Sequence, residues 1–240
     1  RAGSPVQLIR ATWPDGTRVP DDAVVLEHDR LFTVDVPIRI PQETPPTQPY
    51  WLVQEPQGAM FRIADEKLGA ENVRGLPAAP SPLQTVVRLL VHGDTVACPL
   101  TLSYKTLDPL RGDVIEALRI VPPVSVEPMT TVAIARDGNV DMQVRIRAYR
   151  ALQGADVMMN GKTVARGLEL KQETDTLLTI SAPVNSTMDA RLGVRTNGVV
   201  LDDAVKVMDY DHLPTLQYLE PAVVHVVAEN IAITARRICF

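Results

Sequence analysis

The stretch Ile120-Val121-Pro122-Pro123-Val124-Ser125-Val126-Glu127-Pro128 lies at the midpoint of the 240-residue chain and decides how we divide it. Its three prolines disfavour a central β-strand, because proline donates no ladder hydrogen bond and restricts the residue before it. Its isoleucine and valines still favour an extended, half-buried backbone. We therefore predict a stiff proline-rich connector over 122–128 between two β domains, 1–121 and 129–240. Each domain is about the size of one β-sandwich.

Composition limits the classes of protein to which the chain can belong. Hydrophobic residues make up 45% of it and aromatic residues only 4%, so we expect cores of valine, leucine, isoleucine and alanine. The net charge is −5 and no long basic run occurs, which disfavours a nucleic-acid partner. No apolar stretch approaches the roughly 20 residues of a membrane span. We therefore predict neither nucleic-acid binding nor a membrane span.

The first half alternates short apolar segments with turn signals. A turn at Pro14-Asp15-Gly16 ends the first segment, and 31–40 alternates apolar and polar residues around Pro37. The proline-rich 41–49, most of 64–82 and the segment 105–113 are predicted to be loops. The predicted strands are 6–13, 24–26, 31–40, 83–92 and 96–104.

The second half shows the same pattern with clearer turns. Asn160-Gly161 and Asn197-Gly198 are strong signals for two-residue hairpins. The inward positions of 140–149 are predicted to be Val140, Met142, Val144, Ile146 and Ala148. The predicted strands are 130–135, 140–149, 155–159, 164–170, 174–182, 190–195, 199–208, 223–227 and 231–238. The whole pattern predicts an all-β chain with two immunoglobulin-like antiparallel β-sandwich domains in tandem.

Ligands for a metal are sparse in the sequence. None of the four histidines pairs with another at a spacing typical of zinc sites, and there is no Cys-x-x-Cys. Asp209, Asp211 and His212 form the densest local set of ligand atoms and are weak candidates for a calcium or zinc ion. The alternative is a strand that ends in a solvated turn before Pro214. We predict no cofactor.

Catalytic patterns are also missing from the sequence. The adjacent carboxylates Asp21-Asp22 and Asp202-Asp203 point to opposite faces if extended and are typical of turns. No Gly-x-Ser-x-Gly nucleophile elbow and no phosphate-binding glycine loop occurs. We therefore predict no catalytic residue.

Carbohydrate binding is better supported by the residues than metal binding or catalysis. Trp13, Tyr50 and Trp51 are conspicuous in an aromatic-poor chain, and exposed aromatic rings can stack on sugar faces. The alternative is that these rings are buried and pack a sandwich core. We keep all three as candidate carbohydrate-binding residues, and the partner that they would bind is a glycan.

The two cysteines, Cys98 and Cys239, lie one in each half of the chain. They could form a bridge, although two cysteines so far apart are more typical of free, buried thiols. The sequence leaves the redox compartment open.

Five stretches together resemble a known family. They are Gln48-Pro49-Tyr50-Trp51-Leu52; Tyr104 with Asp108-Pro109 and Gly112; 121–126; Tyr210-Asp211-His212-Leu213-Pro214; and Arg237-Ile238. In this order and spacing, the chain from about Gln48 to Phe240 resembles the region downstream of the catalytic domain in large bacterial PIG-L-type (LmbE-like) N-acetylglucosaminyl deacetylases.

The resemblance implies an absence of catalysis in this chain. The family's deacetylase domain binds zinc through Ala-His-Pro-Asp-Asp and a later histidine pair. Here Pro20-Asp21-Asp22 matches the last three letters, but Arg18-Val19 replaces Ala-His and the later pair is absent. A catalytic zinc needs its nitrogen ligands to hold the metal and activate water. No catalytic residue is therefore carried over.

Two functions follow as expectations. The first is a non-catalytic accessory or spacer region of a multidomain PIG-L-like deacetylase, which contacts flanking domains of the same polypeptide and assists glycan presentation. The arginine-led start without a signal peptide, and the end at Cys239-Phe240, favour such a fragment. The resemblance also implies an extracytoplasmic location, either periplasmic or secreted. The second function is a stand-alone carbohydrate-binding module that uses exposed aromatic rings.

Overall fold

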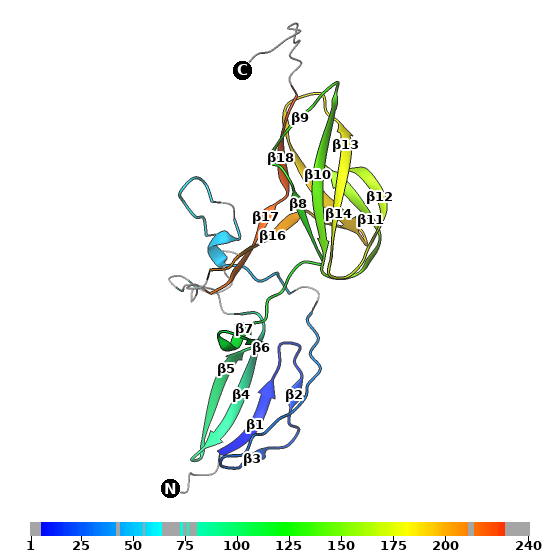
Figure 1. The fold of residues 1–240 in the computed structure, drawn as a ribbon. Helices are drawn as coiled ribbons and strands as arrows, with labels where there is room; N and C mark the ends of the chain where they lie inside the picture. The colour runs from blue at the N-terminus through cyan, green and yellow to red at the C-terminus, as the bar shows by residue number, and fades with distance from the viewer. Residues whose placement is uncertain are drawn as a thin grey trace. The chain divides into compact units, whose positions relative to one another are not determined.

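The computed structural model describes residues 6–41, 44–54, 56–63, 73, 76, 81–210 and 214–228. Strands dominate this part of the chain, which also contains the short 3-10 turn η1 (Tyr50–Leu52). The predicted all-β fold is therefore confirmed (Figure 1). The chain divides into two compact units, Arg1–Thr47 with Ala70–Ile120, and Gln48–Gly69 with Val121–Phe240.

The first unit contains one antiparallel sheet of five strands and a separate hairpin. The order in the sheet is β2-β1-β4-β5, and β3 pairs with the same strand, β1, as β2 does. The bounds are β1 (Val6–Thr12), β2 (Arg18–Val19), β3 (Val24–Leu26), β4 (Gln84–Val91) and β5 (Asp94–Thr101), with β6 (Ser103–Asp108) and β7 (Gly112–Ala117) in the hairpin. A sandwich in this unit stays a prediction.

Two predictions about the first unit are wrong. The segment 105–113 was predicted to be a loop, but most of it forms the β6–β7 hairpin. Asp108 closes its turn, because its Oδ1 accepts the backbone N–H groups of Leu110 and Arg111, both at 2.8 Å. The predicted strand 31–40 is not a strand. Its alternation is real, but Pro37 interrupts the backbone donors that a ladder needs.

The second unit contains two sheets and a two-stranded ribbon. The sheets have the orders β13-β10-β8 and β12-β11-β14-β18-β9, with β15 also paired to β14, and the ribbon is β16–β17. The first strands are β8 (Val124–Pro128), β9 (Val132–Ile134), β10 (Asn139–Ala148), β11 (Leu152–Met159) and β12 (Lys162–Leu170). The remaining strands are β13 (Thr174–Pro183), β14 (Met188–Thr196), β15 (Val199–Leu201), β16 (Asp203–Met208), β17 (Leu216–Pro221) and β18 (Val223–Val227).

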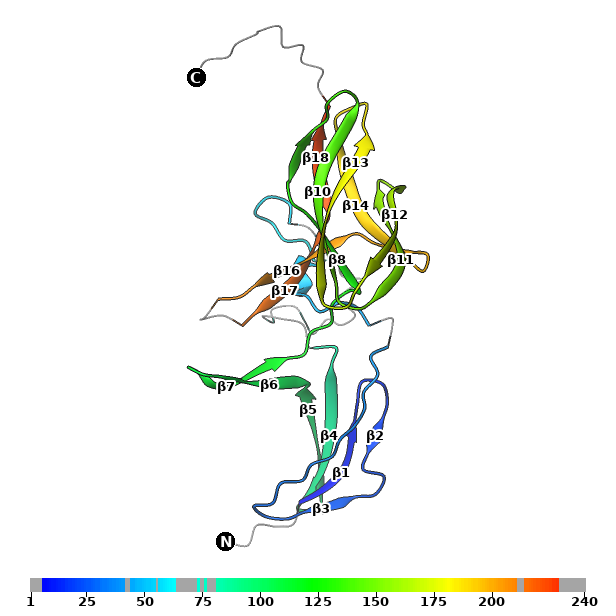
Figure 2. The same ribbon diagram turned by 45° about the vertical axis from the view of Figure 1, so that its right-hand side comes forward.

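The two sheets of the second unit enclose one apolar core (Figures 1 and 2). Strand β10 alternates buried and exposed residues over its whole length, as predicted. Its inward residues Val140, Met142, Val144, Ile146 and Ala148 pack with residues of the opposite sheet such as Val157, Leu192, Val194, Val224 and Val226. Each large apolar side chain that is fully buried contributes roughly 1.5–3 kcal/mol to folding. The second unit is therefore a β-sandwich; its immunoglobulin-like character stays a prediction.

The predicted connector is wrong over 124–128, which forms strand β8 of the second unit. Val124 and Val126 are fully buried, and β8 pairs antiparallel with β10. The prolines allow this because Pro122 and Pro123 precede the strand, while Pro128 is its last residue. The strand is also an edge strand of its sheet, where a missing N–H is tolerated. The predicted domain 1–121 is corrected as well, since Gln48–Gly69 groups with the second unit.

The hairpins at Asn160-Gly161 and Asn197-Gly198 are confirmed. All four residues have positive φ, between 47° and 78°, as a type I′ turn requires. The sequence also predicts a hairpin turn at Arg136-Asp137-Gly138-Asn139, and this turn forms, with backbone hydrogen bonds between Arg136 and Asn139 in both directions. Strand β9 itself pairs in parallel with β18 in the other sheet. The predicted strand 199–208 is split at Asp202 into β15 and β16, and β17 was missed. The predicted strand 231–238 lies outside the described residues.

The core of the second unit yields a stability prediction. Ile146→Ala removes a fully buried side chain of β10, and we expect it to lower the free energy of unfolding by about 2–5 kcal/mol. Leu177→Ala on the adjacent strand β13 is the matched control, because Leu177 is 57% exposed. Its expected effect is within about 0.5 kcal/mol in urea titrations. Equal losses in the two variants would contradict this placement of the core.

Candidate functional site

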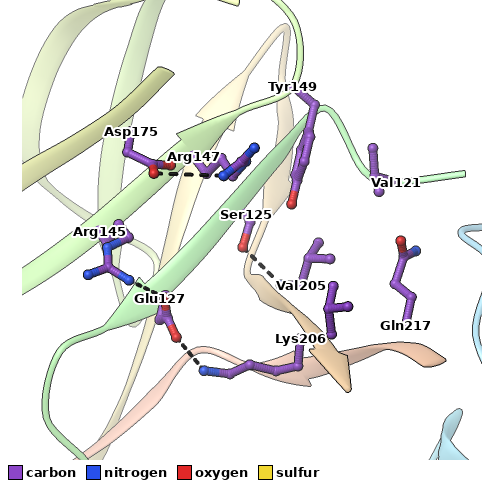
Figure 3. A pocket seen from close by; sticks show the side chains of 11 residues that line it. Val121, Ser125, Glu127, Arg145, Arg147, Tyr149, Asp175, Val205, Lys206 and Gln217 are labelled. Atoms are coloured by element: carbon purple, nitrogen blue, oxygen red, sulfur yellow. Dashed lines mark hydrogen bonds and ion pairs between the residues drawn. The ribbon is translucent and has the colours of Figure 1, made fainter. Parts of the chain in front are cut away.

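The candidate site is a pocket of about 530 Å³ in the second unit, between β8, β10 and the β16–β17 ribbon (Figure 3). Charged and aromatic side chains dominate its lining. They are Glu127, Arg145, Arg147, Tyr149, Asp175 and Lys206.

The sequence places these charges by strand periodicity. Arg145 and Arg147 alternate with the buried residues of β10, so both point away from the core. Glu127 on β8 lies opposite Arg145, and Asp175 on β13 lies opposite Arg147. Opposite charges facing each other across strands stabilise the pairing modestly.

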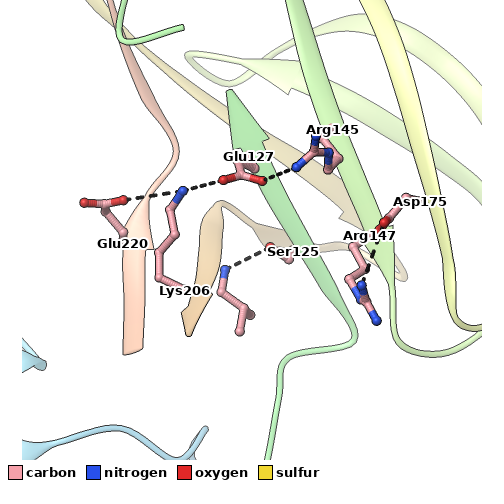
Figure 4. A network of polar contacts seen from close by, with 8 residues as sticks. Ser125, Glu127, Arg145, Arg147, Asp175, Lys206 and Glu220 are labelled. Carbon is pink, nitrogen blue, oxygen red and sulfur yellow. Dashed lines mark hydrogen bonds and ion pairs between the residues drawn. The ribbon is translucent and has the colours of Figure 1, made fainter. Parts of the chain in front are cut away.

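Glu127 is the centre of a chain of ion pairs (Figure 4). Its Oε2 accepts a hydrogen bond from Arg145 Nη1 at 3.2 Å, and its Oε1 accepts one from Lys206 Nζ. Lys206 Nζ also lies 3.9 Å from Glu220 Oε2. The hydrogen bond from Lys206 is the main cause that lowers the pKa of Glu127, and burial opposes it. Glu127 therefore links β8, β10 and the ribbon through charge.

Ser125 makes a second link between β8 and the ribbon. Its side chain is buried, and its hydroxyl oxygen accepts the backbone N–H of Val205 at 2.8 Å. The hydroxyl thus satisfies a backbone donor of β16 at the edge of β8. The ribbon is held to the sandwich by this bond and by the Glu127–Lys206 pair. The residues that make these two contacts are two apart on β8 and adjacent on β16.

Arg147 and Tyr149 form the wall of the pocket nearest the lead into β8. The guanidinium carbon of Arg147 lies 5.4 Å from the ring centroid of Tyr149, which is a cation–π contact. Arg147 also lies 3.7 Å from both Glu173 Oε2 and Asp175 Oδ2. Burial raises the pKa of the Tyr149 hydroxyl; the charge of Arg147 opposes this shift. Tyr149 is therefore a half-buried ring at a polar surface.

The predicted aromatic residues do not form one platform. Trp13 follows β1 in the first unit, whereas Tyr50 and Trp51 form η1 in the second. The rings of Tyr50 and Trp51 are half-buried and meet edge to face, with centroids 5.3 Å apart and planes at 90°. Trp13 is also half-buried, and its Nε1 is a buried atom without a hydrogen-bond partner in the described part of the chain.

The weak metal candidates are not brought together by any described contact. Asp209 is exposed, and its Oδ1 accepts a hydrogen bond from Thr215 Oγ1 at 2.9 Å. Asp211 and His212 lie outside the described residues. Within the described ranges, no group of three or more His, Cys, Asp or Glu side chains is arranged to hold a metal ion.

The carboxylate pair Asp202-Asp203 and the cysteines are the other residues singled out in the sequence. Asp202 Oδ2 accepts a hydrogen bond from Arg191 Nε at 2.5 Å. Burial raises the pKa of Asp203, and the neighbouring Asp202 carboxylate adds to this shift. Cys98 is a free thiol in the structure, and Cys239 lies outside the described residues.

A second pocket, of about 690 Å³, lies against the same ribbon. Residues of the 48–61 segment, among them Gln48 and Phe61, line it together with Arg191 and Tyr218. Gln48 Oε1 accepts the backbone N–H of Leu219 at 3.2 Å, which fixes the start of this segment on β17. The segment thus belongs structurally with a ribbon more than 150 residues away.

Comparison with models of known protein families gives no match, and comparison with curated proteins gives none either. The resemblance to PIG-L-type proteins stays a prediction. Across the part of the chain that the structure describes, no helix is long and apolar enough to span a membrane.

Sequence reasoning missed the Glu127 pocket. The outward positions of Arg145 and Arg147 were predicted from alternation, but their partners come from β8, β13 and β16. The available signal was a pair of arginines, two residues apart, on the exposed face of a strand whose neighbours carry carboxylates.

The ion pairs of Glu127 predict a dependence of stability on pH. Because the folded-state pKa of Glu127 lies below its ordinary value of about 4.5, its contribution is present above that pH and is lost as pH falls through the folded-state pKa. The wild-type chain should therefore exceed Glu127→Gln in free energy of unfolding from pH 7 to about pH 5. This difference should shrink steadily below about pH 4.5.

Urea unfolding between pH 7 and pH 3 measures this difference. Asp141→Asn, which removes an exposed carboxylate from the outward face of β10, controls for the change in net charge. A difference between wild type and Glu127→Gln that grows toward pH 3 would contradict the assigned pairs.

Proposed function

We propose that the chain is a non-catalytic accessory region of a multidomain PIG-L-like deacetylase, which spaces neighbouring domains and assists the presentation of a glycan substrate. The observation that carries the proposal is the structural role of the residues on which the family resemblance rests. Those among them that the structure describes at Gln48, in 104–112 and in 121–126 occur in turns, strands and contacts that hold a segment to a strand within one unit.

The Tyr-x-x-x-Asp-Pro-x-x-Gly stretch supports the proposal first. Asp108 caps the turn of the β6–β7 hairpin, and Gly112 provides the positive φ of 78° that begins β7. The Tyr104 hydroxyl donates to Glu116 Oε2 at 2.6 Å across the same hairpin. Residues with these contacts stabilise a fold, as an accessory region requires.

The stretches at Gln48 and Val121 support it in the same way. Gln48 holds its segment to β17, and Ser125 holds β16 to the edge of β8. Both contacts fix the β16–β17 ribbon on the sandwich. The extracytoplasmic location is part of the same proposal and rests on the resemblance.

The alternative function is a stand-alone carbohydrate-binding module. The edge-to-face pair of Tyr50 and Trp51 favours it, because both rings are only half-buried. Paired aromatic rings at a surface offer apolar area to a sugar ring.

An antibody raised against this chain distinguishes the two functions in an immunoblot of fractionated source cells. The accessory proposal predicts a band far larger than 26.3 kDa, outside the cytoplasmic fraction. A band at 26.3 kDa would contradict the accessory role and favour the stand-alone module. Recombinant chain mixed into the same lysate controls for degradation during preparation.

A further inference from the structure

Two charged groups of the Glu127 pocket have unused hydrogen-bonding capacity. Arg147 Nη1 and Asp175 Oδ2 are 3.7 Å apart, beyond the 2.7–3.2 Å of an ordinary N–H···O hydrogen bond. Their side chains are 47% and 52% exposed. A guanidinium has five N–H donors and a carboxylate about four acceptor positions, so both groups can bind a ligand while keeping their mutual attraction.

The charges around the pocket select against an ionic ligand. The cations Arg145, Arg147 and Lys206 are matched by the carboxylates Glu127, Glu173, Asp175 and Glu220 through the pairs already described. Three cations and four carboxylates leave a net charge of −1, so an anion finds no excess of positive charge. A cation would have to displace Arg145, Arg147 or Lys206 from the carboxylates with which they already pair.

An apolar ligand is also disfavoured, because it would desolvate these charges without replacing their hydrogen bonds to water. A hydroxyl group suits the pocket better, since one oxygen accepts from a guanidinium and donates to a carboxylate. A ligand with several hydroxyls on a rigid ring could place more than one hydroxyl between Arg147 and Asp175, each accepting from the guanidinium and donating to the carboxylate.

Tyr149 adds an aromatic group to this polar surface. Arg147 covers one part of its ring, and Figure 3 shows its hydroxyl directed into the pocket. No hydrogen-bond partner of this hydroxyl occurs in the described ranges. The hydroxyl can therefore bond a ligand, while the ring edge contacts its C–H groups.

A peptide in strand form fits the pocket less well. Strand addition requires a free sheet edge, and the edge of β8 at Ser125 is covered by β16 through the bond to Val205 N. The volume of about 530 Å³ lies within the roughly 300–1,000 Å³ of small-molecule sites.

We propose that the pocket formed by Arg147, Tyr149 and Asp175 binds a short neutral oligosaccharide segment. This inference rests on the proposed glycan-handling function and deepens it by naming the site and the charge class of the ligand. It assigns glycan contact to this pocket in place of the Trp13, Tyr50 and Trp51 set.

The test is an NMR titration of the whole 240-residue chain. The probes are three neutral oligosaccharides, namely cellopentaose, xylopentaose and the chitin pentamer, with trigalacturonate as the anionic probe and a neutral serine–glycine pentapeptide as the peptide probe. We expect saturable shifts with a neutral saccharide, centred on the amides of β10 near Arg147 and Tyr149. Trigalacturonate and the peptide should bind at least about tenfold more weakly.

Substitutions then test the three side chains. Arg147→Gln and Asp175→Asn should each weaken binding about tenfold, because each removes a charged hydrogen-bonding partner. Tyr149→Phe keeps the ring and should weaken binding roughly threefold to tenfold, by the loss of one hydrogen bond. Arg166→Gln, an exposed arginine of β12 outside the lining, is the matched control and should leave affinity unchanged.

Several outcomes would overturn the proposal. One is the absence of saturable shifts with all three neutral saccharides, and another is tighter binding of trigalacturonate or of the peptide. A third is saccharide binding that Trp51→Ala abolishes and Arg147→Gln leaves intact. Tyr149→Phe keeps the test decisive if either charge variant fails to fold. Because the titration uses the chain alone, its result is independent of the immunoblot that tests the accessory role.

Discussion

The burial of one face of β10 is the constraint on which the second unit depends. Five alternate residues from Val140 to Ala148 are buried in the sandwich core, so the residues between them must face outward. A shift of one residue in register would exchange the two sets and place arginines in the core. The core therefore fixes the outward positions of Arg145 and Arg147, and with them two cations of the pocket.

The pocket lies at the edge of the β13-β10-β8 sheet, between β8, β10 and the β16–β17 ribbon. Strand β8 ends one sheet, and its Ser125 and Glu127 side chains hold the β16–β17 ribbon where a further strand would otherwise pair. Ion pairs at partly exposed positions contribute little individually to stability, typically 0–1 kcal/mol. Their effect here is positional, because Glu127 and Ser125 set where the ribbon lies relative to β10. The resulting surface is polar, charge-balanced and carries one half-buried tyrosine.

Local signals in the sequence predicted most of the second unit. The alternation of 140–149 and the Asn-Gly turns depend on neighbouring residues only, and both predictions were correct. Strand β8 was missed because its prolines disfavour a strand, and an edge position that tolerates them is a tertiary property. The segment 31–40 shows the opposite error, since its alternation predicts a strand but no partner strand pairs with it among the described residues. The pocket was missed because Glu127 and Lys206 are 79 residues apart in the chain. Aromatic content alone selected Trp13, Tyr50 and Trp51, which the structure divides between two units.

The central claim is that 124–128 is a core strand of the second unit and the edge on which the pocket is built. Amide hydrogen–deuterium exchange of the intact chain, resolved by peptide, tests it most directly. The account predicts that the amides of Ser125–Glu127 that bond to β10 exchange in the same slow class as those of β10 itself. Exchange of these amides at the rate of an unstructured linker, with β10 still protected, would contradict it.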